Sequence, residues 1–140
     1  MLISSRFSVA VHTLALIDMN DGKVTSEYIA GSVNTNAAVI RRIMGMLSRA
    51  QLIASRPGVI GIKLLKPLRE ITLLDVYRAV ELPEERDLFS IHQNTNIECL
   101  VGKNIQSSLT VPLKEAQHQM ERVLQNTTLE QIVQDIKASC

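Results

Sequence analysis

The stretch LIASRPGVIGIKLL, residues 52–65, most constrains what this chain can fold into. Two short apolar runs lie on either side of a Pro-Gly pair, and this pattern is typical of an antiparallel β-hairpin. The segments that precede the hairpin then decide which fold it belongs to.

Two amphipathic segments open the chain. Residues 3–19 place apolar side chains at helical spacing after a serine cap, either Ser4 or Ser5, and an Asn-Asp-Gly turn follows. Thr25 is expected to cap a short second helix, whose inner face ends at Val33.

A third helix is predicted from a cap at Asn36 to about Ala50. One stripe of this helix is apolar and faces inward. At roughly 100° per residue, the opposite stripe carries small residues between long basic ones. This outward stripe consists of Thr35, Ala38, Arg42, Gly45 and Arg49. Three helices followed by a hairpin is the element order of a winged helix-turn-helix, a mainly α fold with a small β wing.

A further helix follows the hairpin at residues 70–82, with Thr72 as its N-cap. Residues 83–101 are polar and mixed in character, and we expect a loop there. A long helical pattern then runs from about Gly102 to Gln125, and a last short helix is expected at 127–139.

The long helix contains an apolar seam at coiled-coil spacing. Its positions are Leu109, Leu113, Ala116, Met120 and Val123. Pro112 predicts either a kink or a new helix that starts with proline in its first turn. The seam is either a core element of one chain or the interface of a homodimer that meets a two-fold symmetric site. The compact first half leaves the long helix little to pack against, which favours the homodimer.

The net charge of +1 hides an uneven distribution. Residues 1–66 have a net charge of +5, and residues 67–140 have a net charge of −4. A basic first half joined to an acidic second half indicates an anionic partner for the first half only.

Double-stranded DNA is the anion that suits this basic surface. Arg42 and Arg49 are long enough to reach guanine edges in a major groove, and Arg41 on the flank is expected to meet phosphate. Arg56 and Lys63 on the hairpin are placed to enter a minor groove. A merely solvated helix face is the alternative, but helix order, hairpin and charge asymmetry together favour DNA.

Several classes of function find no support. A chain with 46% hydrophobic and 21% charged residues is typical of a soluble globular protein, and no stretch resembles a membrane span or a signal peptide. Two cysteines, Cys99 and Cys140, cannot build a disulfide framework, so we expect a cytoplasmic protein. The histidines are scattered at His12, His92 and His118 without zinc-site spacing, and no nucleophile motif is present. We therefore expect no enzyme, no catalytic residue and no metal site.

Most of the chain resembles a known family. LSRAQLIASRPGVIGIKLLKPLREITLLDVYRAVE (47–81) is similar to the signature stretch of the Rrf-two family of bacterial winged-helix transcription regulators, and ITLLDVYRAVE (71–81) is its most specific piece. Residues 4–17 and 126–133 match less tightly. The resemblance implies a homodimer held by the long C-terminal helix, which binds a partly palindromic operator and usually represses transcription.

The resemblance also assigns the DNA-contacting parts. A hydroxyl-rich start at Ser4 and Ser5 meets the DNA backbone, and residues 35–49 form the recognition helix. The wing departs from the family, because GVIGI at 58–62 replaces consecutive glycines and an aromatic residue. The residues predicted to contact DNA are Ser4, Ser5, Thr35, Asn36, Ala38, Arg41, Arg42, Arg49, Arg56 and Lys63.

Cys99 marks a larger departure. Cluster-binding members of the family carry three cysteines in this loop, and the two earlier positions are Asp87 and Gln93 here. The histidine that some members use as fourth ligand is replaced by Gly102. One thiolate cannot hold an iron–sulfur cluster, which takes four protein ligands, so no cluster or other cofactor is expected.

Two readings of Cys99 stay open: a thiol sensor, or an inherited cysteine without a role. A sensing thiolate needs a positive charge or a helix N-terminus nearby, and here Lys103 and the start of the long helix supply these while Glu98 opposes them. Oxidation would join Cys99 to Cys140 or to a partner subunit, or stop at sulfenic acid. Because the two reading helices of a dimer keep a fixed separation, a change at this loop would release DNA.

The sequence thus divides the chain into a winged helix-turn-helix DNA-binding domain at 1–82, a sensor loop at 83–101 and a dimerisation segment at 102–140. Two alternatives compete with the thiol-responsive repressor. One is the same fold regulated by a small-molecule or protein ligand in the cleft between winged domain and seam helix. The other is a winged helix used only for protein–protein contact, which predicts a shallow salt dependence of DNA binding.

Overall fold

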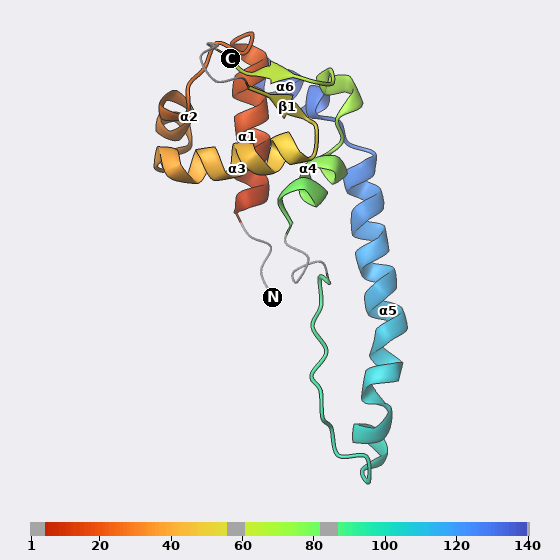
Figure 1. Ribbon diagram of the computed structural model, residues 1–140. Helices are drawn as coiled ribbons and strands as arrows, with labels where there is room; N and C mark the ends of the chain where they lie inside the picture. Colours follow the sequence, from red (N-terminus) through yellow and green to blue (C-terminus); the bar gives the residue numbers. More distant parts are fainter. Residues whose placement is uncertain (1–4, 56–60, 82–86, 140) are drawn as a thin grey trace.

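The computed structural model describes residues 5–55, 61–81 and 87–139 (Figure 1). In chain order the elements are α1 (Arg6–Met19), α2 (Ser26–Val33), α3 (Ala37–Arg49), β1 (Ile53–Ala54), β2 (Lys63–Leu64), η1 (Leu68–Glu70), α4 (Leu73–Val80), α5 (Leu100–Gln125) and α6 (Leu129–Ala138). The predicted order of three helices, a hairpin and further helices is confirmed. Within the described ranges, no helix combines the length and the apolar character needed to cross a membrane.

Side-chain caps set the starts of the helices that build the helix-turn-helix. The Thr25 hydroxyl accepts a hydrogen bond from the Tyr28 amide at 3.0 Å, and the Asn36 side chain accepts one from the Val39 amide at 3.0 Å. Both caps agree with the sequence prediction, and each stabilises its helix by about 1 kcal/mol. Ser5 stands at the N-cap of α1 as expected, but its side chain makes no capping hydrogen bond.

Two later helices begin with reciprocal caps. Thr72 and Asp75 exchange hydrogen bonds at the start of α4, and Thr128 and Gln131 do the same at the start of α6. Each pair satisfies two backbone N–H groups that a helix start would otherwise leave without partners. The cap at Thr72 was predicted from the sequence.

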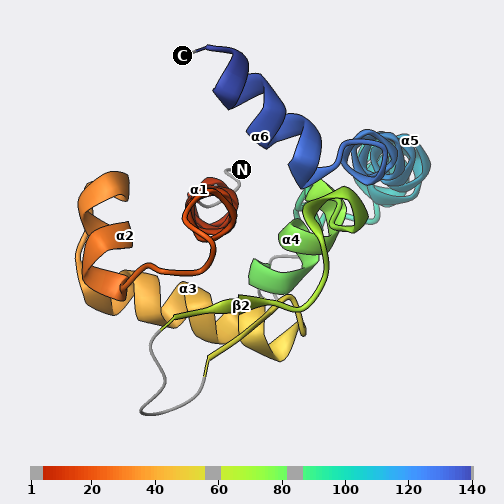
Figure 2. The ribbon, with the colours of Figure 1, turned by 90° about the horizontal axis from the view of Figure 1, so that it is seen from above.

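The hydrophobic core surrounds α1, which Figure 2 shows end-on between α2, α3, α4 and α6. The largest fully buried side chains are Thr13, Leu14, Ile17, Ile29, Ile40, Ile43, Leu47, Ile53, Ile71, Val76 and Leu129. The one hydroxyl among them, that of Thr13, donates to the Val9 carbonyl oxygen at 2.8 Å, so it is satisfied inside the helix. Full burial of each large apolar side chain contributes about 1.5–3 kcal/mol.

The hairpin is short and is tied to the turn after α1. β1 and β2 run antiparallel, with Ile53 opposite Leu64. The Ile62 amide donates to the Gly22 carbonyl oxygen at 2.9 Å. Gly22 has a φ of +77°, and a Cβ there would collide with the Ile62 carbonyl oxygen. Only glycine fits this crossing of the two backbones.

α5 extends away from the core as a helix of 26 residues, roughly 39 Å long (Figure 1). The segment 87–99 lies alongside it, and hydrogen bonds that include the following two join them. The Leu88 amide donates to the Gln117 Oε1 at 2.9 Å, and Gln106 donates to the Gln93 Oε1 at 3.4 Å.

α5 continues through Pro112 without ending. The expectation of a new helix that starts at Pro112 is therefore wrong, because α5 already begins at Leu100. Proline removes one N–H donor from the helix interior. The surrounding turns keep the helix continuous across that gap.

α6 returns to the winged core. Leu129 is fully buried and Val133 is almost so, both against the core that contains α1. The Leu129 amide donates to the Ile71 carbonyl oxygen at 2.8 Å, next to a β-bridge between Thr72 and Thr128. The last helix therefore packs with the winged elements, although the sequence grouped it with the dimerisation segment.

Candidate nucleic-acid interface

The turn between α2 and α3 sets the position of α3, the helix predicted to read DNA. Asn34 adopts a left-handed conformation with φ +68°, which asparagine tolerates better than most residues. The Thr35 amide donates to the Ala30 carbonyl oxygen at 3.0 Å, and Asn36 then caps α3. Three consecutive polar residues thus turn the chain sharply from one helix into the next.

α3 has one buried face and one exposed face. Ile40, Ile43 and Leu47 are at most 1% exposed, and they fix the helix against the core. The opposite face is open to solvent. Its exposed residues are Ala38, Arg41, Arg42, Ser48 and Arg49. Thr35 and Gly45 lie at intermediate depth.

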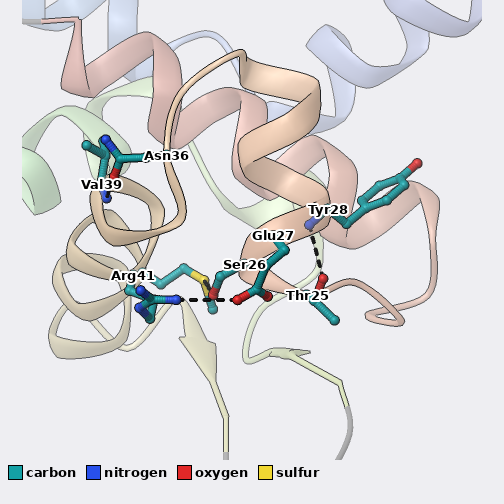
Figure 3. Close-up of polar contacts among 8 residues, drawn as sticks. Thr25, Ser26, Glu27, Tyr28, Asn36, Val39 and Arg41 are labelled. Atoms are coloured by element: carbon teal, nitrogen blue, oxygen red, sulfur yellow. Dashed lines mark hydrogen bonds and ion pairs between the residues drawn. The ribbon is translucent and has the colours of Figure 1, made fainter.

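Arg41 has a partner that the sequence did not predict. Its Nη1 lies 3.5 Å from the Glu27 Oε1 on α2 (Figure 3). Both side chains are more than half exposed, so this ion pair contributes at most about 1 kcal/mol. A DNA phosphate at this position would compete with Glu27 for Arg41.

Asn36 is the N-cap of α3. Figure 3 shows Asn36 beside Val39, whose amide it caps. The cap uses the side-chain oxygen, so a contact with DNA would come from the amide nitrogen. The contact of Asn36 with DNA stays a prediction.

Gly45 leaves room for the Arg49 side chain on the exposed face of α3. A Cβ at Gly45 would be 3.7 Å from the Arg49 Nη1, so the guanidinium reaches back by one helical turn. A larger side chain at Gly45 would occupy the space along which Arg49 lies. This explains why a small residue separates the two basic turns of α3.

The other residues predicted to contact DNA lie outside α3. Ser5 is exposed at the start of α1, and Lys63 is exposed on β2. The hairpin lies next to α3, as Figure 2 shows. Ser4 and Arg56 fall outside the described residues.

Cys99 is exposed at the N-cap of α5, at the end of that helix farthest from the core (Figure 1). The thiol makes no capping hydrogen bond. The backbone N–H groups of Gly102 and Val101 nevertheless lower the pKa of Cys99 below its usual value. These donors belong to the first turn of α5, one of the two sources predicted from the sequence. Lys103, the other predicted source, is not among the groups that lower this pKa.

The donors around Cys99 do not fit an iron–sulfur cluster. Among the residues described, no three His, Cys, Asp or Glu side chains gather closely enough to hold a metal ion. His92 shares the loop with Cys99 and is exposed. A cluster takes four protein ligands, and this loop offers one thiolate.

A family model for Rrf2, described as an iron-dependent transcriptional regulator, matches residues 3–135. The chain belongs to the Rrf2 family. It is a transcription regulator of the Rrf2 type, with a loop whose donors depart from those that a cluster requires.

A curated relative agrees with this family assignment. YwnA from Bacillus subtilis strain 168, which is named as an HTH-type transcriptional regulator, is 46% identical over 132 residues. The alignment covers 94% of this chain and 97% of YwnA. The relative's name describes a regulator and not an enzyme.

Two solved structures share the fold. A crystal structure described as that of a DNA-binding protein has a TM-score of 0.75 and 41% identity, and the match covers 91% of this chain and 98% of that one. A transcriptional regulator structure from Lactobacillus plantarum has a TM-score of 0.80 and 25% identity, covering 96% of this chain and 91% of that one. The fold that this Rrf2 chain shares with the two structures thus covers almost its whole length.

Sequence reasoning missed two parts of the molecule. It did not identify Glu27 as the partner of Arg41, because an exposed glutamate on a short helix carries no signal of its own. It also missed the residues that α4 and α5 bring together, because they are far apart in the chain. No local pattern pairs Arg78 with Glu121, because the two residues are 43 positions apart in the chain.

Proposed function

We propose that this Rrf2 protein is a homodimeric repressor that binds a partly palindromic DNA operator and responds to thiol oxidation through Cys99. The observation that carries the DNA-binding part is the exposed basic face of α3 on a helix-turn-helix whose other face is fully buried. The buried face fixes the orientation of α3 on the core. The basic face therefore points to solvent, where it can enter a major groove.

The side chains of this face divide into base readers and phosphate contacts. Arg42 and Arg49 are exposed on α3 about two turns apart, and each can donate two hydrogen bonds to a guanine. Arg41 and Lys63 lie at the edges of the face, where phosphates would hold the register. Thr35 and Ala38 leave room at the N-terminal end for the bases to approach.

The homodimer is supported by the exposure of α5. None of its 26 residues is fully buried. Of the predicted seam, Leu109, Leu113 and Met120 are half-buried, and Ala116 and Val123 are exposed.

The exposed members of the seam have apolar neighbours on α5. At roughly 100° per residue, Val101, Ala116 and Val123 share one face of the helix. Val101 and Val123 are each 66% exposed. A second copy of α5 packed on this face would cover them and set the distance between two recognition helices at roughly 34–36 Å or a multiple of it.

The thiol response is supported by the position of Cys99 at the start of the helix proposed for dimerisation. Its lowered pKa increases the thiolate fraction, and the thiolate is the form that oxidants attack. Cys140 lies outside the described residues, but α6 packs at the opposite end of α5 from Cys99 (Figure 1). Oxidation is therefore expected to give a sulfenic acid or a link to the partner subunit, rather than a bond within one chain.

A gel-shift titration against the DNA upstream of its own gene tests the proposal. Wild type should bind tightly and lose affinity steeply as salt rises, because neutralised phosphates release counterions. Arg49→Ala should weaken binding about tenfold to a hundredfold, and Arg69→Ala, on the exposed side of η1, should change it little. Binding that is shallow in salt would favour a winged helix used only for protein contact.

The same titration with mildly oxidised protein tests the thiol response. Oxidation should release DNA from wild type and leave Cys99→Ser unaffected. If oxidation affects both proteins equally, or neither, then Cys99 is not the switch and the DNA-binding proposal stands on its own.

A further inference from the structure

The turn between α1 and α2 is bonded to the end of α1. The Gly22 amide donates to the Ile17 carbonyl oxygen at 2.7 Å, and Ile17 is buried in the core. The Lys23 amide donates to the Asn20 carbonyl oxygen at 3.0 Å. These hydrogen bonds fix the backbone of the turn on the core.

The same turn meets the hairpin at one carbonyl oxygen. The Gly22 carbonyl oxygen accepts hydrogen bonds from the Ile62 amide at 2.9 Å and from the Val24 amide at 3.0 Å. Val24 leads into α2, and Ile62 directly precedes β2. The side chains of Val24 and Ile62 are both buried. The helix-turn-helix and the hairpin are therefore joined at the backbone of Gly22.

Glycine stands on both sides of this contact. Gly22 has a φ of +77° and Gly61 has a φ of +109°, and residues with side chains rarely adopt these values. A Cβ on Gly22 would collide with the Ile62 carbonyl oxygen, and a Cβ on Gly61 would lie 3.2 Å from the Gly22 carbonyl oxygen. The two backbones thus come closer together than a side chain at Gly22 would allow.

The paired part of the hairpin is short, so its direction depends on how each strand is attached. β1 and β2 contain two residues each, and a two-stranded hairpin is marginally stable by itself. β1 is attached to α3, because the Leu52 amide donates to the Leu47 carbonyl oxygen at 3.0 Å. β2 is attached through Ile62 to Gly22. The position of β2 relative to α3 therefore depends on the Gly22 contact.

We propose that Gly22 is a positioning residue for DNA binding, which acts through the hairpin and does not itself contact DNA. Its contact with Ile62 places the next residue, Lys63, which is exposed on β2 at the edge of the face of α3. A lysine contacts a phosphate only where its backbone holds it within reach of the DNA. The inference rests on the proposed function, because it names what holds one of the proposed phosphate contacts in place.

Gly22→Ala tests the inference in gel-shift titrations of the full-length chain over a series of salt concentrations. The added Cβ should push β2 away, so affinity for the DNA upstream of its own gene should fall about tenfold, since one charge-assisted phosphate contact is lost. The slope of log affinity against log salt should become shallower by about one. Gly31→Ala on the exposed side of α2 is the matched control. A Cβ there meets nothing within 4 Å, so affinity and slope should stay unchanged.

Lys63→Ala separates positioning from a merely structural role. By itself it should change affinity and slope as Gly22→Ala does. In the Gly22→Ala background it should change neither any further, because the lysine is already out of reach. A partial loss of fold lowers the fraction of active protein but leaves the salt slope of the remaining protein unchanged. Weaker binding by Gly22→Ala at the wild-type slope, or additive effects of the two substitutions, would therefore overturn the inference.

A second variant applies if circular dichroism shows that Gly22→Ala does not fold. A Cβ on Gly61 approaches the same carbonyl oxygen less closely, so Gly61→Ala should cause a smaller loss of affinity that disappears in the Lys63→Ala background. Wild-type affinity and slope in Gly61→Ala would then overturn the inference. A wild type that binds no DNA contradicts the proposed function. Wild-type binding whose slope is insensitive to Lys63→Ala overturns this inference alone, so the two failures are distinguishable.

Discussion

The winged core and α5 solve the problem of burying apolar surface in opposite ways. The core collects fully buried side chains from α1, α2, α3, α4 and α6. α5 is the longest helix described and contains no fully buried residue. The core is therefore stabilised within one chain, whereas α5 presents apolar surface whose burial depends on something else. The predictions below test this difference.

A core truncation should have the largest effect on stability. Leu47 is fully buried on α3, so Leu47→Ala should lower the free energy of unfolding by about 2–5 kcal/mol. Urea denaturation monitored by circular dichroism measures this loss. Val111→Ala, at a position on α5 that is 74% exposed, is the comparison and should change stability by less than about 0.5 kcal/mol. Equal losses would show that α5 is as tightly packed as the core.

A charge on the exposed face of α5 should act on assembly instead. Val123→Glu would place two carboxylates in the proposed symmetric interface, and we expect the dimer dissociation constant to rise by about a hundredfold. Analytical ultracentrifugation measures the change. The far-ultraviolet circular dichroism of the variant should stay that of the wild type. A wild type that sediments as a monomer at all concentrations would contradict the role given to this face.

Removing the partner of Arg41 should have a smaller effect. Glu27→Gln removes an exposed ion pair at 3.5 Å, so the free energy of unfolding should fall by less than about 1 kcal/mol. DNA affinity should rise slightly, because Arg41 would no longer have to break its ion pair with Glu27 before it contacts a phosphate. Weaker DNA binding in this variant would show that Glu27 positions Arg41 rather than competing for it.

Cys99 should have the smallest effect on stability and a clear chemical signature. Its pKa is lowered by the Gly102 and Val101 amides, so the thiolate is favoured in the folded chain and forms at a lower pH than in the unfolded chain. The rate of alkylation by iodoacetamide, measured against pH in a Cys140→Ser background, should therefore have its midpoint at lower pH in folded protein than in urea. Coincident midpoints would mean that the helix start does not act on the thiol.

The same contrast explains what could be predicted from the sequence. Thr25, Asn36 and Thr72 were identified as caps because capping depends on residues three apart in the chain. The hairpin and the two faces of α3 were likewise visible as local patterns. Ser5 shows the limit of this reasoning, because a serine at the right position does not need to make the capping bond.

Long-range contacts account for what was missed. The Arg41–Glu27 pair and the Arg78–Glu121 pair arise only when separate helices meet. The sequence predicted a kink or a new helix start at Pro112, and α5 runs through Pro112 without a new start. A local rule describes the cost of proline in a helix, but not whether the neighbouring turns keep the helix whole.

Because α6 packs against the core, the chain returns to the core after the long helix α5. Segment 87–99 runs away from the core, and α5 runs back towards it. α6 then packs against the same core to which α4 belongs. The packing of α6 thus fixes the C-terminal end of α5 to the core. Cys99 lies at the end of α5 that is roughly 39 Å from the core. If the proposed oxidation occurs there, a displacement of that end would change the angle at which α5 leaves the core.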